Sequence, residues 1–105
     1  MKLMRSYHNA KPCVKAIIYD DTTQRKIKVR GKPARVLKAL TLANSKGVTA
    51  IELSNTWALR LSEYISVLRH KYSLNIETLK EPHHDGWHGR YVLHTHVEII
   101  LTINF

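Results

Sequence analysis

The chain has 105 residues, of which 44% are hydrophobic and 24% charged, so it is long enough for one globular domain and too short for two stable cores. No apolar run approaches the roughly 20 residues of a membrane-spanning helix, and the first residues lack the apolar stretch of a secretory signal. Cys13 is the single cysteine, which excludes an internal disulfide. We therefore expect a cytoplasmic protein without a membrane partner.

The net charge of +9 favours a polyanionic partner, most simply nucleic acid. Residues 1–48 carry twelve Lys or Arg and two Asp, a net charge of +10, whereas residues 49–105 carry five basic and six acidic residues, a net charge of −1. A nucleic-acid-binding protein with this distribution would contact phosphates through its N-terminal half.

Residues 1–13 are basic and without periodicity, which predicts a flexible arm ahead of a single domain at 14–105. VKAIIYD and KIKVR, separated by DDTTQ, predict a β-hairpin over 14–30. Its second strand alternates between Ile27 or Val29 and the cations Lys26, Lys28 and Arg30. Such a row is typical of a lysine-protected edge strand, and equally of a ribbon that follows phosphates.

Two helical patterns follow the hairpin. Pro33 suits the first turn of a helix, and Gly47 suits the residue after its end near 45–46. Thr49 and Glu52 have the spacing of a capping box, which predicts a short second helix over 50–54.

A third and longer helix is predicted over 56–73, because its large apolar residues fall on one stripe. They are Trp57, Leu61, Tyr64, Ile65, Leu68 and Tyr72. The rest of the chain has the two-residue period of strands, with a second hairpin whose tip is predicted at 82–89. The apolar tail 97–105 alternates with Val97, Ile99, Leu101, Ile103 and Phe105 on one face. We expect it to pair either with the first hairpin or with a second subunit, which would give a homodimer through the terminal strands.

Five runs carry a resemblance to a known family: RGKPARVLKAL, GVTAIEL, WALRLSEYISVLRHKY, LNIETLKEP and GWHGRYVL. With these runs, the segment from Gly31 to His94 resembles the small winged helix-turn-helix proteins of bacteriophages, prophages and their hosts. The resemblance implies an α+β fold with three helices and a β-hairpin wing, a core at 31–96 and DNA binding. The N-terminal hairpin and the C-terminal strand are additions to it. The glycine that usually follows the third helix is replaced by Ser73.

Sequence-specific binding to double-stranded DNA by a phage or prophage regulator, in the bacterial cytoplasm, is the function we predict. The third helix would enter the major groove, with Arg60 reading guanine and Ser62 and Ser66 touching bases or phosphates. Glu63 would either accept a hydrogen bond from cytosine or pair with a neighbouring cation such as Arg60. Arg69 would contact phosphate. Asn55 and Thr56 would cap the helix or touch phosphate.

The wing would contact the DNA backbone or minor groove through Lys80, His84, His88 and Arg90, while Trp87 is expected to fold back over the core. The phosphate contacts predicted ahead of the helices are Lys26, Lys28, Arg30, Lys32 and Arg35. On this division of labour, replacing Arg60 relaxes sequence preference, whereas replacing Lys26 and Lys28 together weakens binding to every sequence.

Seven histidines raise the question of a metal, but their spacing matches no zinc module. No paired carboxylates, phosphate loop or nucleophile with a base is evident, so we expect no metal, no cofactor and no enzymatic activity. Two other functions stay open. One is a winged-helix adaptor or inhibitor that binds a host protein, and the other is RNA or single-strand binding through the basic hairpin with Tyr7 and Tyr19.

Overall fold

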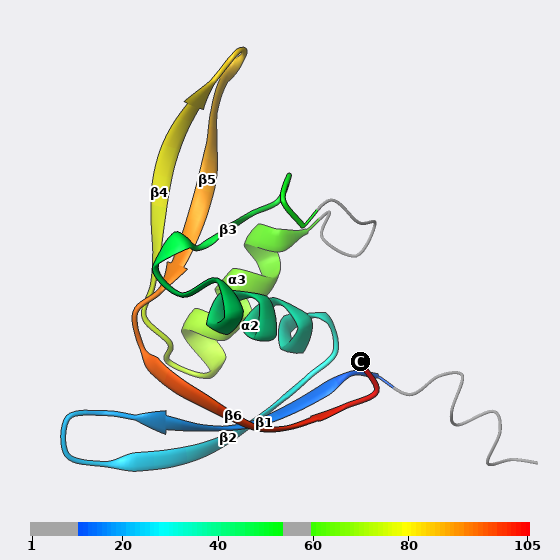
Figure 1. Ribbon diagram of the computed structural model, residues 1–105, viewed down its shortest axis with the longest axis vertical. Coiled ribbons are helices and arrows are strands. Elements are labelled where there is room, and N and C mark those ends of the chain that lie inside the picture. Colours follow the sequence, from blue (N-terminus) through cyan, green and yellow to red (C-terminus); the bar gives the residue numbers. More distant parts are fainter. Residues whose placement is uncertain (1–10, 54–59) are drawn as a thin grey trace, which may run out of the picture.

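The computed structural model describes residues 11–53 and 60–105, and it places two helices between two small antiparallel sheets (Figure 1). One sheet has the order β2-β1-β6 and lies below the helices in this view. The other has the order β3-β5-β4 and ends in a hairpin that projects from the opposite side.

The first hairpin forms as predicted, with β1 at Cys13–Tyr19 and β2 at Gln24–Arg30. Its turn is closed by a hydrogen bond from Asp20 N to Thr23 O at 2.9 Å. Strand alternation sends Val14 and Val29 into the core, while Lys15 and Lys28, also paired, lie exposed on the other face. We call these the inner and outer faces of the first sheet.

The apolar tail forms β6 at His96–Ile103 and pairs with β1 of the same chain. The strand therefore has a hydrogen-bonding partner without a second subunit. The predicted single apolar face is wrong, because a β-bulge shifts the register between Lys15 and Ala16. Leu101 and Ile103 are consequently 46% and 38% exposed. The homodimer stays a prediction.

The first predicted helix is present as α2 at Lys32–Ala43, followed by a 3-10 turn at Asn44–Lys46 that Gly47 terminates. The capping box also forms: Thr49 N donates to Glu52 Oε1 and Glu52 N donates to Thr49 Oγ1, each at 3.1 Å. The described residues 50–53 nevertheless form a turn and not the start of a regular helix. A two-residue strand, β3 at Val48–Thr49, precedes it and pairs with β5.

The third predicted helix is α3 at Leu61–Lys71, which begins later and ends earlier than expected; residues 56–59, including Trp57, lie outside the described part. After the helix, Ser73 adopts φ +57°, and Leu74 N donates to Leu68 O at 3.2 Å. Ser73 therefore makes the turn that glycine makes most readily, at the cost of a Cβ in the left-handed region.

The second hairpin consists of β4 at Ile76–His83 and β5 at Gly86–Leu93, so the predicted tip at 82–89 is too long. The ladder continues through Pro82, which pairs with Trp87. Proline is tolerated there because β4 is an edge strand and its missing N–H would have faced away from the ladder.

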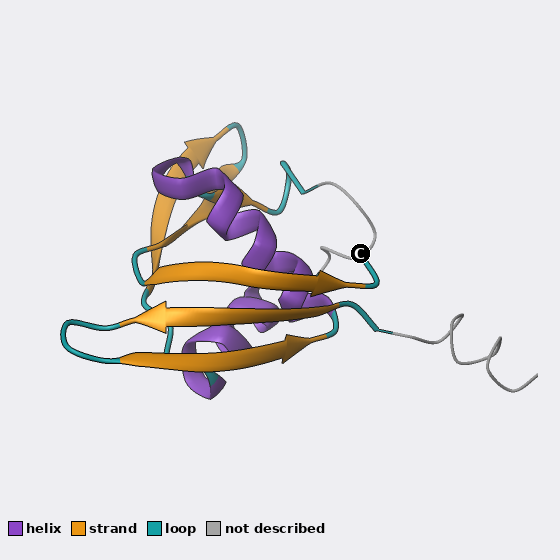
Figure 2. Cartoon of the chain, turned by 60° about the horizontal axis from the view of Figure 1, so that its bottom comes forward, coloured by secondary structure: helices purple, strands orange, loops and turns teal. Residues whose placement is uncertain are grey.

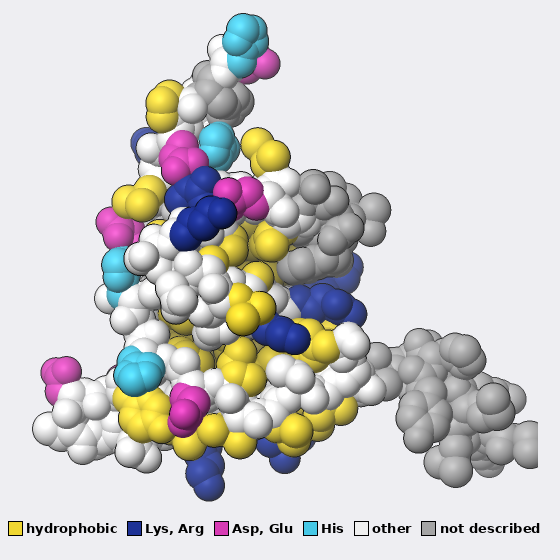
Figure 3. All heavy atoms as spheres, in the orientation of Figure 1, with side chains coloured by type: hydrophobic (Ala, Val, Ile, Leu, Met, Phe, Trp, Pro, Cys, Tyr) yellow, Lys and Arg dark blue, Asp and Glu magenta, His cyan; other side chains and the backbone are white. Residues whose placement is uncertain are grey.

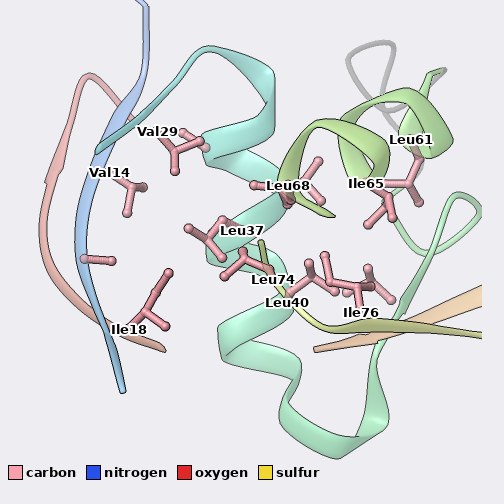
Figure 4. Packing of buried hydrophobic residues seen from close by; sticks show 14 residues of the cluster. Val14, Ile18, Val29, Leu37, Leu40, Leu61, Ile65, Leu68, Leu74 and Ile76 are labelled. Carbon is pink, nitrogen blue, oxygen red and sulfur yellow. The ribbon is translucent and has the colours of Figure 1, made fainter. Parts of the chain in front are cut away.

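One hydrophobic cluster joins both sheets to both helices (Figure 4). Its fully buried side chains come from the inner face of the first sheet and from the apolar stripes of α2 and α3. The largest are Ile18, Leu37, Leu40, Ile65, Leu68, Val14, Val29 and Val36. The cluster thus extends beyond the predicted core at 31–96, because β1 supplies Val14, Ala16 and Ile18.

Candidate nucleic-acid interface

The outward face of α3 is exposed along its length. Leu61, Ile65 and Leu68 are buried against the core, which fixes the rotation of the helix about its axis. The opposite face carries Ser62, Glu63, Ser66, Val67 and His70, all exposed. Since β6 pairs with β1 in the first sheet, the terminal strand does not lie over this face.

Arg60 and Glu63 form an ion pair at the start of α3, with Nη1 and Oε2 3.6 Å apart. Both side chains are largely exposed, at 71% and 64%. A pair this exposed contributes little to stability and is readily broken. Arg60 is thus available to an incoming acceptor, and the local pairing expected for Glu63 is present.

Arg69 faces the second hairpin instead of solvent. Its Nε and Nη2 donate to Ile76 O at 3.0 and 2.6 Å, and Nη2 also donates to Thr78 Oγ1 at 2.7 Å. The guanidinium therefore ties α3 to β4, and a phosphate would have to compete with these acceptors.

Arg90 links the hairpin to the capping-box turn. Its Nε donates to Glu81 Oε2 at 2.6 Å, and its two Nη atoms donate to the oxygens of Glu52 at 3.0 and 3.1 Å. A further bond runs from Nη1 to Lys46 O at 3.2 Å, and the side chain is 18% exposed. Arg90 thereby binds the hairpin through Glu81 and the turn through Glu52 and Lys46, because the planar guanidinium can donate several hydrogen bonds at once.

The carboxyls respond to this network. Hydrogen bonds from Arg90 hold the pKa of Glu52 and of Glu81 below the usual 4.5, although partial burial opposes the shift. The same bonds raise the pKa of Arg90 above its ordinary value, so it stays charged throughout. A carboxyl whose pKa is lowered by folding stabilises the fold above pH 4.5, and that stabilisation is lost as the pH falls through the lowered value.

We expect Arg90→Met to weaken this pH response. The wild-type melting temperature should fall between about pH 5 and pH 3, whereas the variant should be less stable near neutrality and should lose less stability on acidification, since Glu52 and Glu81 no longer accept hydrogen bonds from Arg90. Circular-dichroism melts across this range measure both slopes. Arg60→Met, which removes an exposed pair, should keep the wild-type slope; an unchanged slope in Arg90→Met would contradict the role given to Arg90.

The wing carries fewer free cations than expected. Trp87 is 56% exposed, so the expectation that it folds over the core is wrong; it lies one pair from the end of the ladder, beyond the reach of the core. Lys80 Nζ instead stands 4.8 Å from the centroid of the Trp87 ring. His88 Nε2 is 3.0 Å from Glu81 Oε1, and His84 is exposed at the tip.

The basic row of β2 points away from α3. Lys26, Lys28 and Arg30 are exposed on the outer face of the first sheet, while α3 packs on the inner face. Figure 3 shows Lys or Arg side chains projecting below that sheet, on the side opposite to the helices. The row and the outward face of α3 are therefore separate surfaces, and the phosphate contacts of Lys26, Lys28 and Arg30 stay a prediction. Alternation along β2 fixes the outward direction of these cations.

Two further cations predicted to contact phosphate lie on α2. Lys32 is exposed at the first residue of the helix, and Arg35 is half-buried. The Arg35 Cζ stands 5.7 Å from the centroid of the Phe105 ring, and Lys38 Nζ stands 4.9 Å from it. Asn55 and Thr56, the other predicted contacts near the helix start, lie outside the described residues.

Sequence reasoning missed Glu52 and Glu81 as partners of Arg90. The capping box explains Glu52 by its local bonds with Thr49, so the sequence offered no reason to expect its pairing with Arg90 as well. The alternation of β4 offered a signal for Glu81, because the register pairs it with His88 and places Arg90 two residues further along on the same face.

Histidines are engaged in separate places. His94 Nε2 lies 2.7 Å from Glu77 Oε1, and the His96 ring lies 4.8 Å from the Tyr19 ring. Across residues 11–53 and 60–105, no three His, Cys, Asp or Glu side chains gather closely enough to hold a metal ion. Within the same ranges, neither helix is long and apolar enough to span a membrane.

Residues 26–102 match the model of a family described as winged helix domain. No curated protein and no solved structure matches the chain.

Proposed function

Because the chain belongs to the winged helix domain family, we propose that it binds double-stranded DNA in a sequence-specific manner through α3 and the β4–β5 hairpin. The observation that carries the proposal is the outward face of α3, which is exposed among the described residues, with Arg60 at its start and the hairpin fixed beside it by Arg69. An α-helix of this kind fits the major groove, where base edges are distinguishable.

Arg60 is the base-reading residue of this proposal. Its guanidinium exchanges the Glu63 carboxylate for the two acceptors of a guanine, while Ser62 and Ser66 follow on the same outward face. Lys80 and His84 on the wing contact the backbone, and Lys32 is the cation of α2 that could add a phosphate contact. The setting is a phage or prophage regulator acting in the cytoplasm of a bacterial host.

Arg60→Ala is expected to lower affinity for the preferred site about tenfold and to leave affinity for unrelated duplexes nearly unchanged, because one bidentate base contact is lost. The preferred site comes from selection on a random duplex pool, and fluorescence anisotropy measures both affinities. Arg30→Ala removes the same side chain from the outer face of the first sheet and should leave the ratio intact. Equal losses in both variants would rule out Arg60 as the reader.

A second function, binding of a host protein without DNA recognition, is favoured by the internal engagement of Arg69 and Arg90, which leaves the α3 and wing surface weakly charged. Retention on heparin and on duplex DNA at physiological salt distinguishes the two, since an adaptor elutes early. Competition between duplex and single strands tests the third alternative, RNA or single-strand binding.

A further inference from the structure

The outer face of the first sheet combines exposed aliphatic side chains with cations. Figure 2 shows its three strands in front of the helices, with neither α2 nor α3 on this side. Ile100, placed at the bulge of β6, is 56% exposed, and Leu101 next to it is 46% exposed. Isolated exposed isoleucines are ordinary, but a contiguous aliphatic patch on a small domain indicates a binding surface.

A hollow of about 490 Å³ lies across β1 in this face. It is lined by Ile17 and Ile100 together with Lys15, Lys26 and Lys28. The register explains the grouping: Ile17 pairs with Lys26 and Lys15 pairs with Lys28, so these side chains share one face. Because lysine is longer than isoleucine, the ammonium groups surround an aliphatic floor.

We propose that this hollow docks an acidic amphipathic segment of a partner protein, with an apolar side chain inserted between the isoleucines and carboxylates paired with the surrounding lysines. Charge complementarity selects the acidic partner, because three lysines line the hollow. Glu98, which the register places beside Ile17 on this face, is outside the lining and accepts a hydrogen bond from Tyr19 Oη at 2.7 Å. The lining of the hollow contains no residue of α3, so the site does not depend on DNA binding by the outward face of that helix.

Other occupants match the surface less well. A second copy of the chain would bring its own lysines against these, and like charges repel. Nucleic acid would leave the aliphatic floor without a counterpart, because the lining contains no aromatic ring on which a base could stack. A flat lipid surface meets the ammonium groups before the isoleucines, so it does not fill the hollow.

The test is an NMR titration of the ¹⁵N-labelled full chain with a short synthetic helix-forming peptide, leucine on one face and glutamate on the other. Amide shifts should be confined to β1, β2 and β6. Two control peptides, with lysine in place of glutamate or with serine in place of leucine, should bind at least about tenfold more weakly. Shifts centred on α3 or the wing, or equal binding of either control peptide, would overturn the proposal.

Matched variants sharpen the test. Ile100→Asp and the double variant Lys26→Glu, Lys28→Glu should each weaken the peptide about tenfold. Leu42→Asp, which adds the same charge at a 73% exposed leucine of α2, should change binding by no more than about twofold. The lysine variant is on β2, so the proposal is still tested if Ile100→Asp disturbs β6. Two further results would overturn the proposal if the peptide fails to bind. One is self-association of the chain that Ile100→Asp abolishes, and the other is binding to phosphatidylglycerol vesicles that Ile100→Asp abolishes.

Discussion

Replacing Leu68 by alanine is expected to lower the free energy of unfolding by about 3 kcal/mol. Leu68 has no exposed surface, and it packs α3 against residues of α2 and of the first sheet in a single cluster. Truncation removes the transfer free energy of the side chain and leaves a cavity, since neighbours on three elements cannot all move inward. Urea denaturation followed by far-ultraviolet circular dichroism measures the loss, which is a large part of the ~5–15 kcal/mol typical of a domain.

Leu42→Ala provides the matched comparison, because Leu42 also lies in a helix but is 73% exposed. Its change in unfolding free energy should stay within about 0.5 kcal/mol. Similar losses in the two variants would mean that α3 does not pack on the core as described. The rotation of α3, and with it the outward face proposed to read DNA, would then be unsupported.

Replacing Gly47 by alanine is the second change with a large expected effect. Gly47 has φ +70° and ψ −174°, a backbone conformation that is essentially restricted to glycine. A Cβ there would lie 2.5 Å from Tyr91 O and 2.8 Å from Val92 Cγ2. Since Tyr91 O is a backbone atom of the paired strand β5, the clash cannot be relieved by a side-chain rotation. We expect a loss of about 3–5 kcal/mol in unfolding free energy.

Gly31→Ala separates the two causes of this loss. Gly31 has a similar conformation, with φ +78° and ψ −155°, but its added Cβ would meet nothing closer than 3.7 Å, at Pro33 Cδ. Backbone strain alone should therefore cost about 1–3 kcal/mol. The excess in Gly47→Ala measures the close approach of the turn to β5. If the two alanine variants lose the same free energy of unfolding in chemical denaturation, the turn does not approach β5 as closely as described.

The candidate site was predictable only where a residue acts with near neighbours in the chain. The pairing of Arg60 with Glu63 follows from helical spacing, and so does the outward position of Ser62. The sequence pattern puts Arg69 on the polar surface of the helix with these residues. Its side chain instead donates to Ile76 O, because α3 packs beside the start of β4. No periodicity within α3 reveals which element lies beside each of its outer residues.

What the sequence by itself determined about this protein is its local structure: the hairpin of β1 and β2, the start of α2, the reciprocal bonds of Thr49 with Glu52, and the buried stripe of α3. These depend on periodicity and on contacts within a few residues.

Only the tertiary structure decided that the cations of β2 face away from α3, that Arg90 joins Glu52 to Glu81, and that a bulge exposes Leu101 and Ile103. Each of these depends on the register of distant strands and on which face of a sheet the helices cover. Such choices are made by the packing of the whole core and not by any local run of residues.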